Sequence, residues 1–229
     1  MTRALFVTSS GTGLGKTYVT ALLCRQLRET GRAVRAVKPV LSGFSEGEAA
    51  SSDAGVILTA LGREVTTATI ESVSPWRYRA AIAPDRAAAR EGRAVPFEQV
   101  AGFCRKVLAE PSDTVLIEGV GGVMAPISAD KLNIDLMAAL EIPALLVVGS
   151  YLGTISHTLT ALSALAARRV PIAGVVVSQS PDAPLDLEET VAAISRLVGS
   201  APVTGLSRLA RWHEQPDVTS LLEDRNSAP

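Results

Sequence analysis

The segment SSGTGLGKT, at residues 9–17, constrains the fold more than any other part of the chain. It lies between an apolar run at 4–8 and a stretch at 17–30 whose apolar residues recur at helical spacing. Its three glycines give the backbone positions of high conformational freedom. A strand that enters such a loop and leaves it as a helix is the setting of a phosphate-binding loop. The segment therefore predicts a nucleotide site at the carboxyl end of a strand.

Short apolar runs alternate with helical patterns along the rest of the chain. Strands are expected at 4–8, 33–37, 114–119, 143–150 and 172–180, with a weaker candidate at 202–207. Helices are expected at 17–30, 53–62, 97–109, 132–141, 155–168 and 185–199. Continuous Val/Ile/Leu runs are typical of strands covered on both faces. We predict an α/β fold of the P-loop NTPase type, a doubly wound, mostly parallel sheet with helices on both faces. One domain is expected to span 1–229, with 223–229 a frayed tail.

Composition excludes several classes of protein. The formal net charge is −1 and no basic stripe stands out, so binding to nucleic acid has little support. No apolar run approaches the roughly 20 residues that span a bilayer. The N-terminal apolar run is too short for a signal peptide. Cys24 and Cys104 lie far apart without CxxC spacing, and Cys24 falls in an amphipathic pattern that favours a buried thiol. We expect a cytoplasmic protein with no membrane partner.

Within the glycine-rich loop, the backbone amides around Gly13, Leu14 and Gly15 are expected to cradle phosphates. Lys16 would reach the terminal phosphates and the Thr17 hydroxyl would contact Mg²⁺. The alternative is a simple strand-to-helix turn, which Ser10 favours slightly because glycine usually opens such a loop. The correct flanks on both sides favour the nucleotide site.

Lysine is rare in this arginine-rich chain, which has 22 basic residues in all. Two of its lysines, Lys16 and Lys38, follow predicted strands. Because lysine presents a compact ammonium where arginine presents a wide fork, Lys38 in AVKPVLSG is interpreted as facing the same cleft and holding an anionic reactant. The alternative is a solvated residue before a proline.

An acidic residue, Glu118, ends the predicted strand at 114–119 and precedes a glycine-rich turn. This is where a phosphate-loop enzyme places a second metal contact, directly or through water. A surface carboxylate is the alternative. Asp53, in SSDAGVIL, is a weaker metal candidate because it has a rival role as a helix N-cap.

Five motifs occur in order, namely FVTSSGTGLGKT, VKPVLSG, the SDA around Asp53, LIEGVGG and LGTISH. Together they resemble the dethiobiotin synthetase family, over residues 4 to about 180. The resemblance implies a Mg²⁺-dependent homodimeric ligase of biotin biosynthesis that uses ATP, 7,8-diaminopelargonate and CO₂ or bicarbonate. One amine captures CO₂ as a carbamate, and γ-phosphoryl transfer makes a carbamic–phosphoric anhydride. The second amine then closes the ureido ring and expels phosphate.

The resemblance also implies roles for single residues. Lys16 and Lys38 would neutralise phosphate and carbamate, which repel each other, and Thr12 would hydrogen-bond the reacting groups. The implied metal contacts, direct or through water, are Thr17, Asp53 and Glu118. The implied substrate contacts are Ser42 for the carbamate or phosphate end, Gly121 and Gly122 near the diamine, and Gly153, Thr154 and Ser156 for the tail carboxylate across the dimer. Thr154 or Ser156 as a helix cap is the alternative for that last site.

The sequence departs from the family pattern at several positions. Ser178 stands where many members carry an asparagine that reads adenine, and a hydroxyl cannot offer the paired donor and acceptor of an amide. Weaker base discrimination is therefore expected, with CTP or other nucleoside triphosphates as candidate co-substrates beside ATP. Ser156 likewise replaces an asparagine of the carboxylate site. Ser9 and Ser10 replace a glycine–threonine opening, and Gly13 stands where some members have glutamate.

Another class of protein shares this architecture. A P-loop switch or partitioning ATPase would be an interaction protein, and such proteins usually carry a second lysine at the position of Gly11. A small-molecule kinase gives no reason for the VKPVLSG and LGTISH segments. A non-enzymatic relative remains open at the level of sequence.

Overall fold

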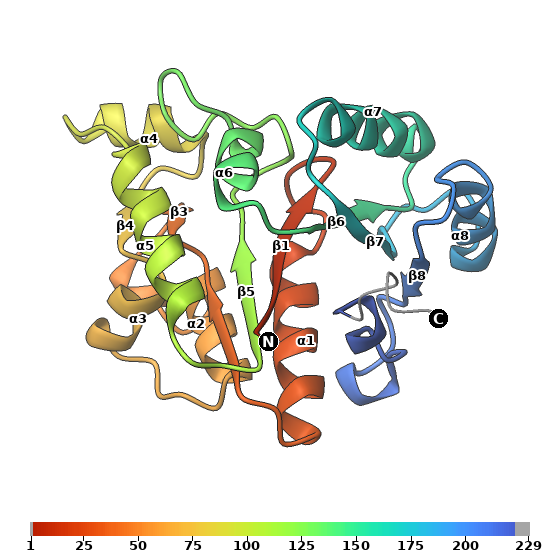
Figure 1. The fold of residues 1–229 in the computed structure, drawn as a ribbon, viewed down its shortest axis with the longest axis horizontal. Helices are drawn as coiled ribbons and strands as arrows, with labels where there is room; N and C mark the ends of the chain where they lie inside the picture. The colour runs from red at the N-terminus through yellow and green to blue at the C-terminus, as the bar shows by residue number, and fades with distance from the viewer. Residues whose placement is uncertain (1, 223–229) are drawn as a thin grey trace.

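Six parallel strands form the central sheet of the computed structural model, which describes residues 2–222 (Figure 1). The spatial order is β2-β5-β1-β6-β7-β8. The strands are β1 (Arg3–Ser9), β2 (Val34–Val37), β5 (Thr114–Glu118), β6 (Ala144–Gly149), β7 (Ile172–Ser178) and β8 (Val203–Leu206). All six predicted strands, including the weaker candidate at 202–207, are confirmed. Because β1 lies between β5 and β6, its carboxyl end opens at the middle of the sheet.

Helices connect these strands. They are α1 (Lys16–Glu29), α2 (Asp53–Ala60), α3 (Thr67–Val73), α4 (Pro84–Arg90), α5 (Phe97–Ala109), α6 (Asn133–Leu140), α7 (Thr154–Ala167) and α8 (Leu187–Ser195), with 3-10 turns η1 (Glu46–Glu48), η2 (Trp212–Glu214) and η3 (Thr219–Leu222). The six predicted helices are present. The helix predicted at 185–199 is shorter at both ends, and it begins only after Asp186, whose extended backbone serves as the N-cap.

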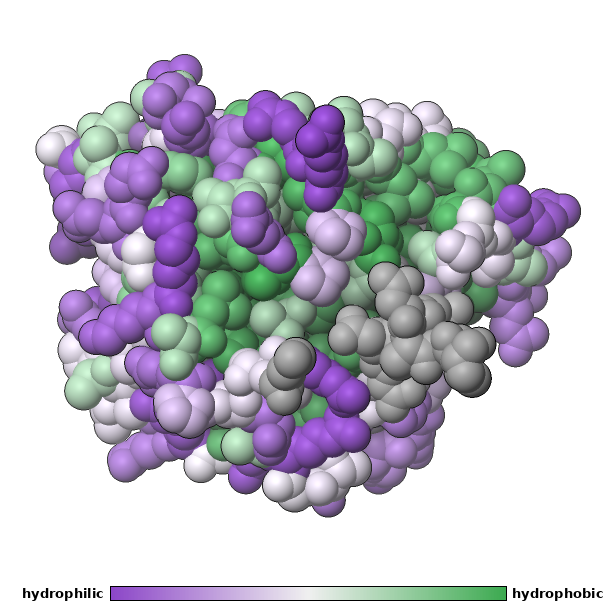
Figure 2. Space-filling model, in the orientation of Figure 1, coloured by the Kyte–Doolittle hydropathy of each residue, from purple (hydrophilic) through white to green (hydrophobic). Residues whose placement is uncertain are grey.

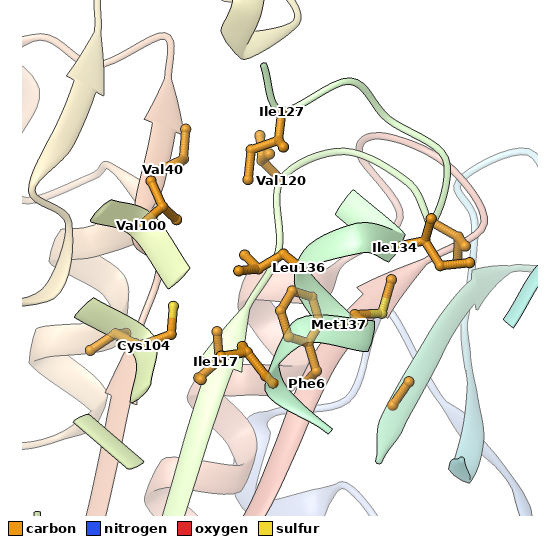
Figure 3. Packing of buried hydrophobic residues seen from close by; sticks show 14 of the residues in the cluster. Phe6, Val40, Val100, Cys104, Ile117, Val120, Ile127, Ile134, Leu136 and Met137 are labelled. Carbon is orange, nitrogen blue, oxygen red and sulfur yellow. The ribbon is translucent and has the colours of Figure 1, made fainter. Parts of the chain in front are cut away.

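The two faces of the sheet bury different side chains. Along β1, Phe6 packs into one core cluster, whereas Leu5 and Val7 pack into the other. The first cluster contains side chains of α5, α6 and α7, and Figure 3 shows Phe6 and Ile117 beneath α6. The second contains the apolar face of α1 together with the last residues of η3. Helices therefore cover both faces, which confirms the doubly wound prediction.

Residues 38–95 contain elements that the sequence did not predict. Strands β3 (Val40–Ser42) and β4 (Trp76–Tyr78) form a separate parallel pair. Helix α3 starts at a capping box between Thr66 and Thr69, and α4 starts with Pro84 in its first turn. Three-residue strands and seven-residue helices are too short to show a hydrophobic period, which is why the pattern missed them. The unassigned segment at 75–84 is thus β4 and the approach to α4.

Other sequence predictions concern burial and membranes. Both cysteines are buried thiols, and burial raises the pKa of each to about 12. Over residues 2–222, none of the helices combines the length and the apolar character that crossing a bilayer requires. The frayed tail predicted at 223–229 lies outside the described residues.

Candidate active site at the carboxyl end of the sheet

The glycine-rich loop connects β1 to α1 and bends at two left-handed residues. Gly13 has φ 74° and Gly15, the N-cap of α1, has φ 92°. A Cβ on Gly15 would lie 2.8 Å from the Ser178 hydroxyl oxygen, so this glycine is needed for space as well as for conformation. No side chain caps α1 within the described chain. Its first N–H groups are therefore left to an anion, as in a phosphate-binding loop.

Lys16 begins α1 and is almost fully buried, at 6% exposed. Its Nζ donates to Ser9 Oγ at 3.1 Å. Burial, and after it the neighbouring charge of Lys38, lowers the pKa of Lys16 to about 8. A buried ammonium without a full counter-charge favours an incoming anion, because the anion restores the lost solvation.

Ser9 is a site residue that the sequence analysis treated only as a departure from the family pattern. Its hydroxyl accepts from Lys16 and donates toward the carbonyl oxygens of Gly11 and Gly121, the latter at 3.0 Å. It thereby ties the phosphate loop to the glycine-rich turn after β5. The signal available in the sequence was a polar residue directly after the apolar run at 4–8, and the structure adds that Ser9 is fully buried.

Three charged side chains meet behind the loop. Lys38 Nζ contacts Asp53 Oδ2, and it lies 2.8 Å from Glu118 Oε1. Burial acts to lower the pKa of Lys38, but the two carboxylates outweigh burial and hold it above its usual value. Burial acts to raise the pKa of Asp53, and Lys38 outweighs it and holds that pKa below its usual value. Lys38 is thus held in the site as an ammonium. The alternative, a solvated residue before a proline, is wrong.

The acidic residues are placed differently from each other. Glu118 is fully buried, so the surface-carboxylate alternative is wrong, and Thr17 Oγ1 donates to its Oε1 at 2.6 Å. Asp53 is the first residue of α2. The N-cap is Ser52, whose Oγ accepts from Gly55 N at 3.2 Å. The N-cap alternative for Asp53 is therefore wrong as well, and its carboxylate turns to Lys38 instead.

A cavity of about 360 Å³ brings most of the predicted reaction-centre residues together. Its lining residues are Thr12, Gly13, Gly15, Lys16, Thr17, Lys38, Leu41, Ser42, Asp53, Val120 and Gly121. Gly122 lies beside the loop, where a Cβ would come within 3.2 Å of Ser9 O and Gly11 N. The turn after β5 thus approaches the phosphate loop backbone to backbone, and a side chain at this position would crowd it.

A second cavity, of about 210 Å³, adjoins the first and shares Gly13 and Gly15 with it. The predicted residues Leu14 and Ser178 lie in its lining. The remaining lining residues are Tyr18, Gln179, Ser180, Pro181, Leu206, Ser207 and Arg208. None of these others was predicted. Most of them come from the loops after β7 and β8, which carry no recognisable motif, whereas Tyr18 lies in α1 and Leu206 ends β8.

The third predicted group stands at the start of α7. Gly153, with φ 96°, is the N-cap, and neither Thr154 nor Ser156 caps the helix. The Thr154 hydroxyl instead donates to Gly149 O at 2.6 Å, which makes the capping alternative wrong for it. Ser156 is exposed. These three residues line neither cavity.

The side-chain oxygens at this site suit a hard divalent cation only if a bound ligand supplies further oxygen atoms. Over residues 2–222, no cluster of three His, Cys, Asp or Glu side chains could hold a metal ion. Two carboxylates and the Thr17 hydroxyl are nevertheless close together. Glu118 Oε2 is buried and has no hydrogen-bond partner within the described chain. A buried, orphaned carboxylate oxygen beside a hydroxyl fits Mg²⁺ whose remaining ligands are phosphate oxygens and water.

Comparison with known proteins supports the family resemblance that the sequence motifs indicate. A family described as an AAA domain matches residues 3–220. The chain is 46% identical over 200 residues to the ATP-dependent dethiobiotin synthetase BioD of Methylobacterium nodulans, covering 85% of this chain and 89% of that protein. The protein of the same name from Acidiphilium cryptum is 43% identical over 198 residues, or 86% of this chain and 89% of its own length.

Solved structures support the fold alone. The signal recognition particle receptor FtsY from Elizabethkingia anophelis has a TM-score of 0.56 at 14% identity, covering 97% of this chain and 64% of the receptor chain. Chloroplast FtsY from Physcomitrella patens has a TM-score of 0.52 at 16% identity, covering 97% and 64%. The predicted P-loop NTPase fold is thereby confirmed, and at these identities the likeness carries no activity.

Proposed function

The chain belongs to the ATP-dependent dethiobiotin synthetase family, and from that premise we propose which of its residues bind the reactants and how they act. It is an ATP-dependent ligase of biotin biosynthesis. One amine of 7,8-diaminopelargonate adds to CO₂ and loses a proton, giving a carbamate. The carbamate oxygen takes the γ-phosphoryl group, and ADP leaves. The second amine attacks the carbonyl carbon, loses a proton and expels phosphate, which closes the ureido ring.

The proposed reaction centre is the cavity between the phosphate loop and Lys38. Carbamate and triphosphate are both anions, so cations must hold them together before they react. Lys16 and Lys38 line the same cavity, together with Thr17, and this observation carries the proposal. We assign Lys16 to the terminal phosphates, Lys38 to the carbamate and γ-phosphoryl group, and the Thr12 hydroxyl to hydrogen bonds with the reacting oxygens. Ser42 would orient the carbamate end.

We propose Mg²⁺ as the metal, held by Thr17, Asp53 and Glu118 directly or through water. When bound, it would neutralise charge on the β- and γ-phosphate oxygens. Lys38 pairs with both carboxylates in this structure, so the same side chain that neutralises them is the one assigned to the carbamate. The carboxylates would exchange this partner for the metal as Lys38 turns to substrate.

The diamine site and the homodimer are proposed together. Gly121 lines the reaction cavity and Gly122 lies beside the loop, where a substrate chain could run along the backbone. The amides of Gly153 and Thr154, with Ser156, would bind the tail carboxylate of a diamine held mainly by the partner subunit. Their absence from the lining of both cavities of their own chain supports that arrangement. Figure 2 shows hydrophobic residues gathered over α6 and α7, a surface suited to the second subunit.

The base would occupy the second cavity, beside Ser178. ATP is the co-substrate of the family. Because serine lacks the paired donor and acceptor of asparagine, we propose weak base discrimination that extends to CTP and other nucleoside triphosphates. We also propose that residues 1–229 act as one domain in the cytoplasm, where ATP is supplied.

The alternative hypothesis, a switch or partitioning ATPase, is not supported. Curated relatives named dethiobiotin synthetase match over 85–86% of the chain, and the second lysine expected of a switch protein is glycine at position 11.

The deciding experiment is phosphate release from Mg-ATP and bicarbonate, measured with and without 7,8-diaminopelargonate. We expect release that depends on the diamine and matches the dethiobiotin formed one to one. Lys106→Met, at an exposed site on α5, is the matched control for Lys38→Met, which should abolish both products. Phosphate release that ignores the diamine would refute the assignment. Repeating the assay with CTP tests the role of Ser178.

A further inference from the structure

Residues 207–218, between β8 and η3, contain no strand or α-helix, and the first two of them, Ser207 and Arg208, line the base cavity. The single regular turn in this segment is η2. Such a segment needs other partners for its backbone polar groups. Three glutamine side chains supply them, from the position directly after β7, from α1 and from the segment itself: Gln179, Gln26 and Gln215.

Gln215 makes the densest of these contacts and is itself buried, at 8% exposed. Its Nε2 donates to Ser207 O at 2.6 Å and to Ala210 O at 3.3 Å, while its Oε1 accepts from Ser207 N at 3.2 Å. The amide therefore pairs with Ser207 as a neighbouring peptide group would. Because the Ser207 N–H can only donate and the carbonyls can only accept, the orientation of this amide is fixed.

The same amide also reaches the opposite wall of the cavity. Gln215 Nε2 donates to the Tyr18 hydroxyl at 2.9 Å. Tyr18 lies in the first turn of α1, directly after the phosphate loop, and it lines the base cavity with Ser207. One side chain thus sets the spacing between the phosphate-loop side and the outer side of this cavity.

Gln179 holds the outer wall from the end of β7. Its Oε1 accepts from Arg208 N at 3.1 Å and from Ser207 Oγ at 3.3 Å. Because Oε1 of Gln179 already accepts these two hydrogen bonds, its Nε2 is the group that remains to donate to a base. A single donor recognises an acceptor atom, and adenine, guanine and cytosine all present one.

We propose that Gln215 is a positioning residue for nucleotide binding, which sets the width of the base cavity by linking the 207–210 loop to Tyr18. The inference rests on the proposed nucleotide site. Gln215 does not touch the nucleotide, and its effect passes through Ser207 and Tyr18. Its loss should weaken binding of any ligand that carries a base, and spare a ligand that fills the phosphate loop alone.

The test compares dissociation constants of Mg-ATP and Mg-tripolyphosphate by calorimetry on the full chain. Gln215→Ala should raise the dissociation constant of Mg-ATP roughly tenfold, which corresponds to about one well-formed hydrogen bond. The dissociation constant of Mg-tripolyphosphate should stay within about twofold of the wild-type value. In the assay, KM for ATP should rise while kcat stays near that of the wild type. Binding of ATP by the wild-type chain tests the proposed function separately.

Gln26→Ala is the matched control, because Gln26 holds the same segment far from the base. Its Nε2 donates to Pro216 O and its Oε1 accepts from Val218 N, both at 3.0 Å. This variant should lower the melting temperature but change neither dissociation constant. Tyr18→Phe, a milder change that removes one contact of Gln215, should raise the ATP constant about threefold and serves if Gln215→Ala does not fold.

Two results would overturn the proposal. One is an equal loss of ATP and tripolyphosphate affinity in Gln215→Ala and Tyr18→Phe, which would mean a general disturbance of the phosphate loop. The other is an ATP constant that neither variant changes.

Discussion

At the scale of single residues, the site is governed by Lys38. Lys38 is 5% exposed, and its ammonium contacts both Asp53 and Glu118. Two carboxylates this close repel each other, and Lys38 relieves the repulsion inside a medium that screens poorly. The residue therefore serves the fold of the empty site as well as the proposed chemistry.

Lys38→Met should consequently destabilise the protein and not only inactivate it. Breaking a buried ion pair by removing one partner costs about 3–5 kcal/mol, because the other charge stays buried. Urea unfolding of the variant measures this loss. Adding Glu118→Gln to Lys38→Met should recover part of the stability without activity. A double variant less stable than Lys38→Met would contradict the pairing.

The pH dependence of nucleotide binding should follow Lys16. Its pKa is about 8 in the empty site, and a bound phosphate would raise it. Below pH 8 the ammonium is already formed and affinity is independent of this group. Above pH 8 binding must take up a proton, so affinity should fall by up to about tenfold per pH unit. Dissociation constants between pH 7 and 9.5 test this, and a flat profile in the wild type would refute it. In Lys16→Arg, which stays charged, the slope should vanish.

At the scale of elements, the conformation of the loop between β1 and α1 depends on Gly15. This residue has a left-handed backbone conformation and no space for a Cβ atom. Gly15→Ala adds left-handed strain, of about 1–3 kcal/mol, to an overlap with the Ser178 hydroxyl. We expect nucleotide affinity to fall at least about tenfold. Gly92→Ala is the control, since Gly92 has φ 66° but no atom within 4 Å of an added Cβ. It should lose stability and keep affinity. Ser178→Gly should partly rescue Gly15→Ala, and no rescue would mean that strain alone acts.

How far the sequence predicts the molecule depends on the length of each element. The apolar pattern of the sequence predicts the long strands and the amphipathic helix after the loop. The loop motif predicts that Lys16 and Thr17 lie near the end of a strand. The motifs also predicted that Lys38 and Ser42 lie near the loop, and both line the same cavity as Lys16. Strands β3 and β4, three residues each, carry no period. Gln215 could not be found, because its role arises from contacts with Tyr18, 197 positions away in sequence.

At the scale of the whole molecule, one sheet carries two cores. Leu22 of α1 belongs to one and Met137 of α6 to the other, and both are fully buried. Because β1 contributes to both cores through alternate side chains, loss of either should be felt by the entire sheet.

Leu22→Ala and Met137→Ala should therefore each lower stability by about 2–5 kcal/mol. Each variant should still unfold in one transition by calorimetry and by circular dichroism. Two separate transitions in either variant would mean that the cores fold independently, against the proposed single domain. The exposed Leu209, 92% accessible, offers a control substitution that should change stability little.

The pairing of charges in the cleft has a consequence for the kinetics of encounter. Near neutral pH the ammonium groups of Lys16 and Lys38 are matched by the carboxylates of Asp53 and Glu118, so these four side chains together give the empty cleft little net charge. Fields that guide a ligand over long distances arise from an unbalanced charge. A nucleotide would thus arrive by ordinary diffusion, at a rate that changes little with ionic strength, and the attraction between ammonium and phosphate begins only after contact.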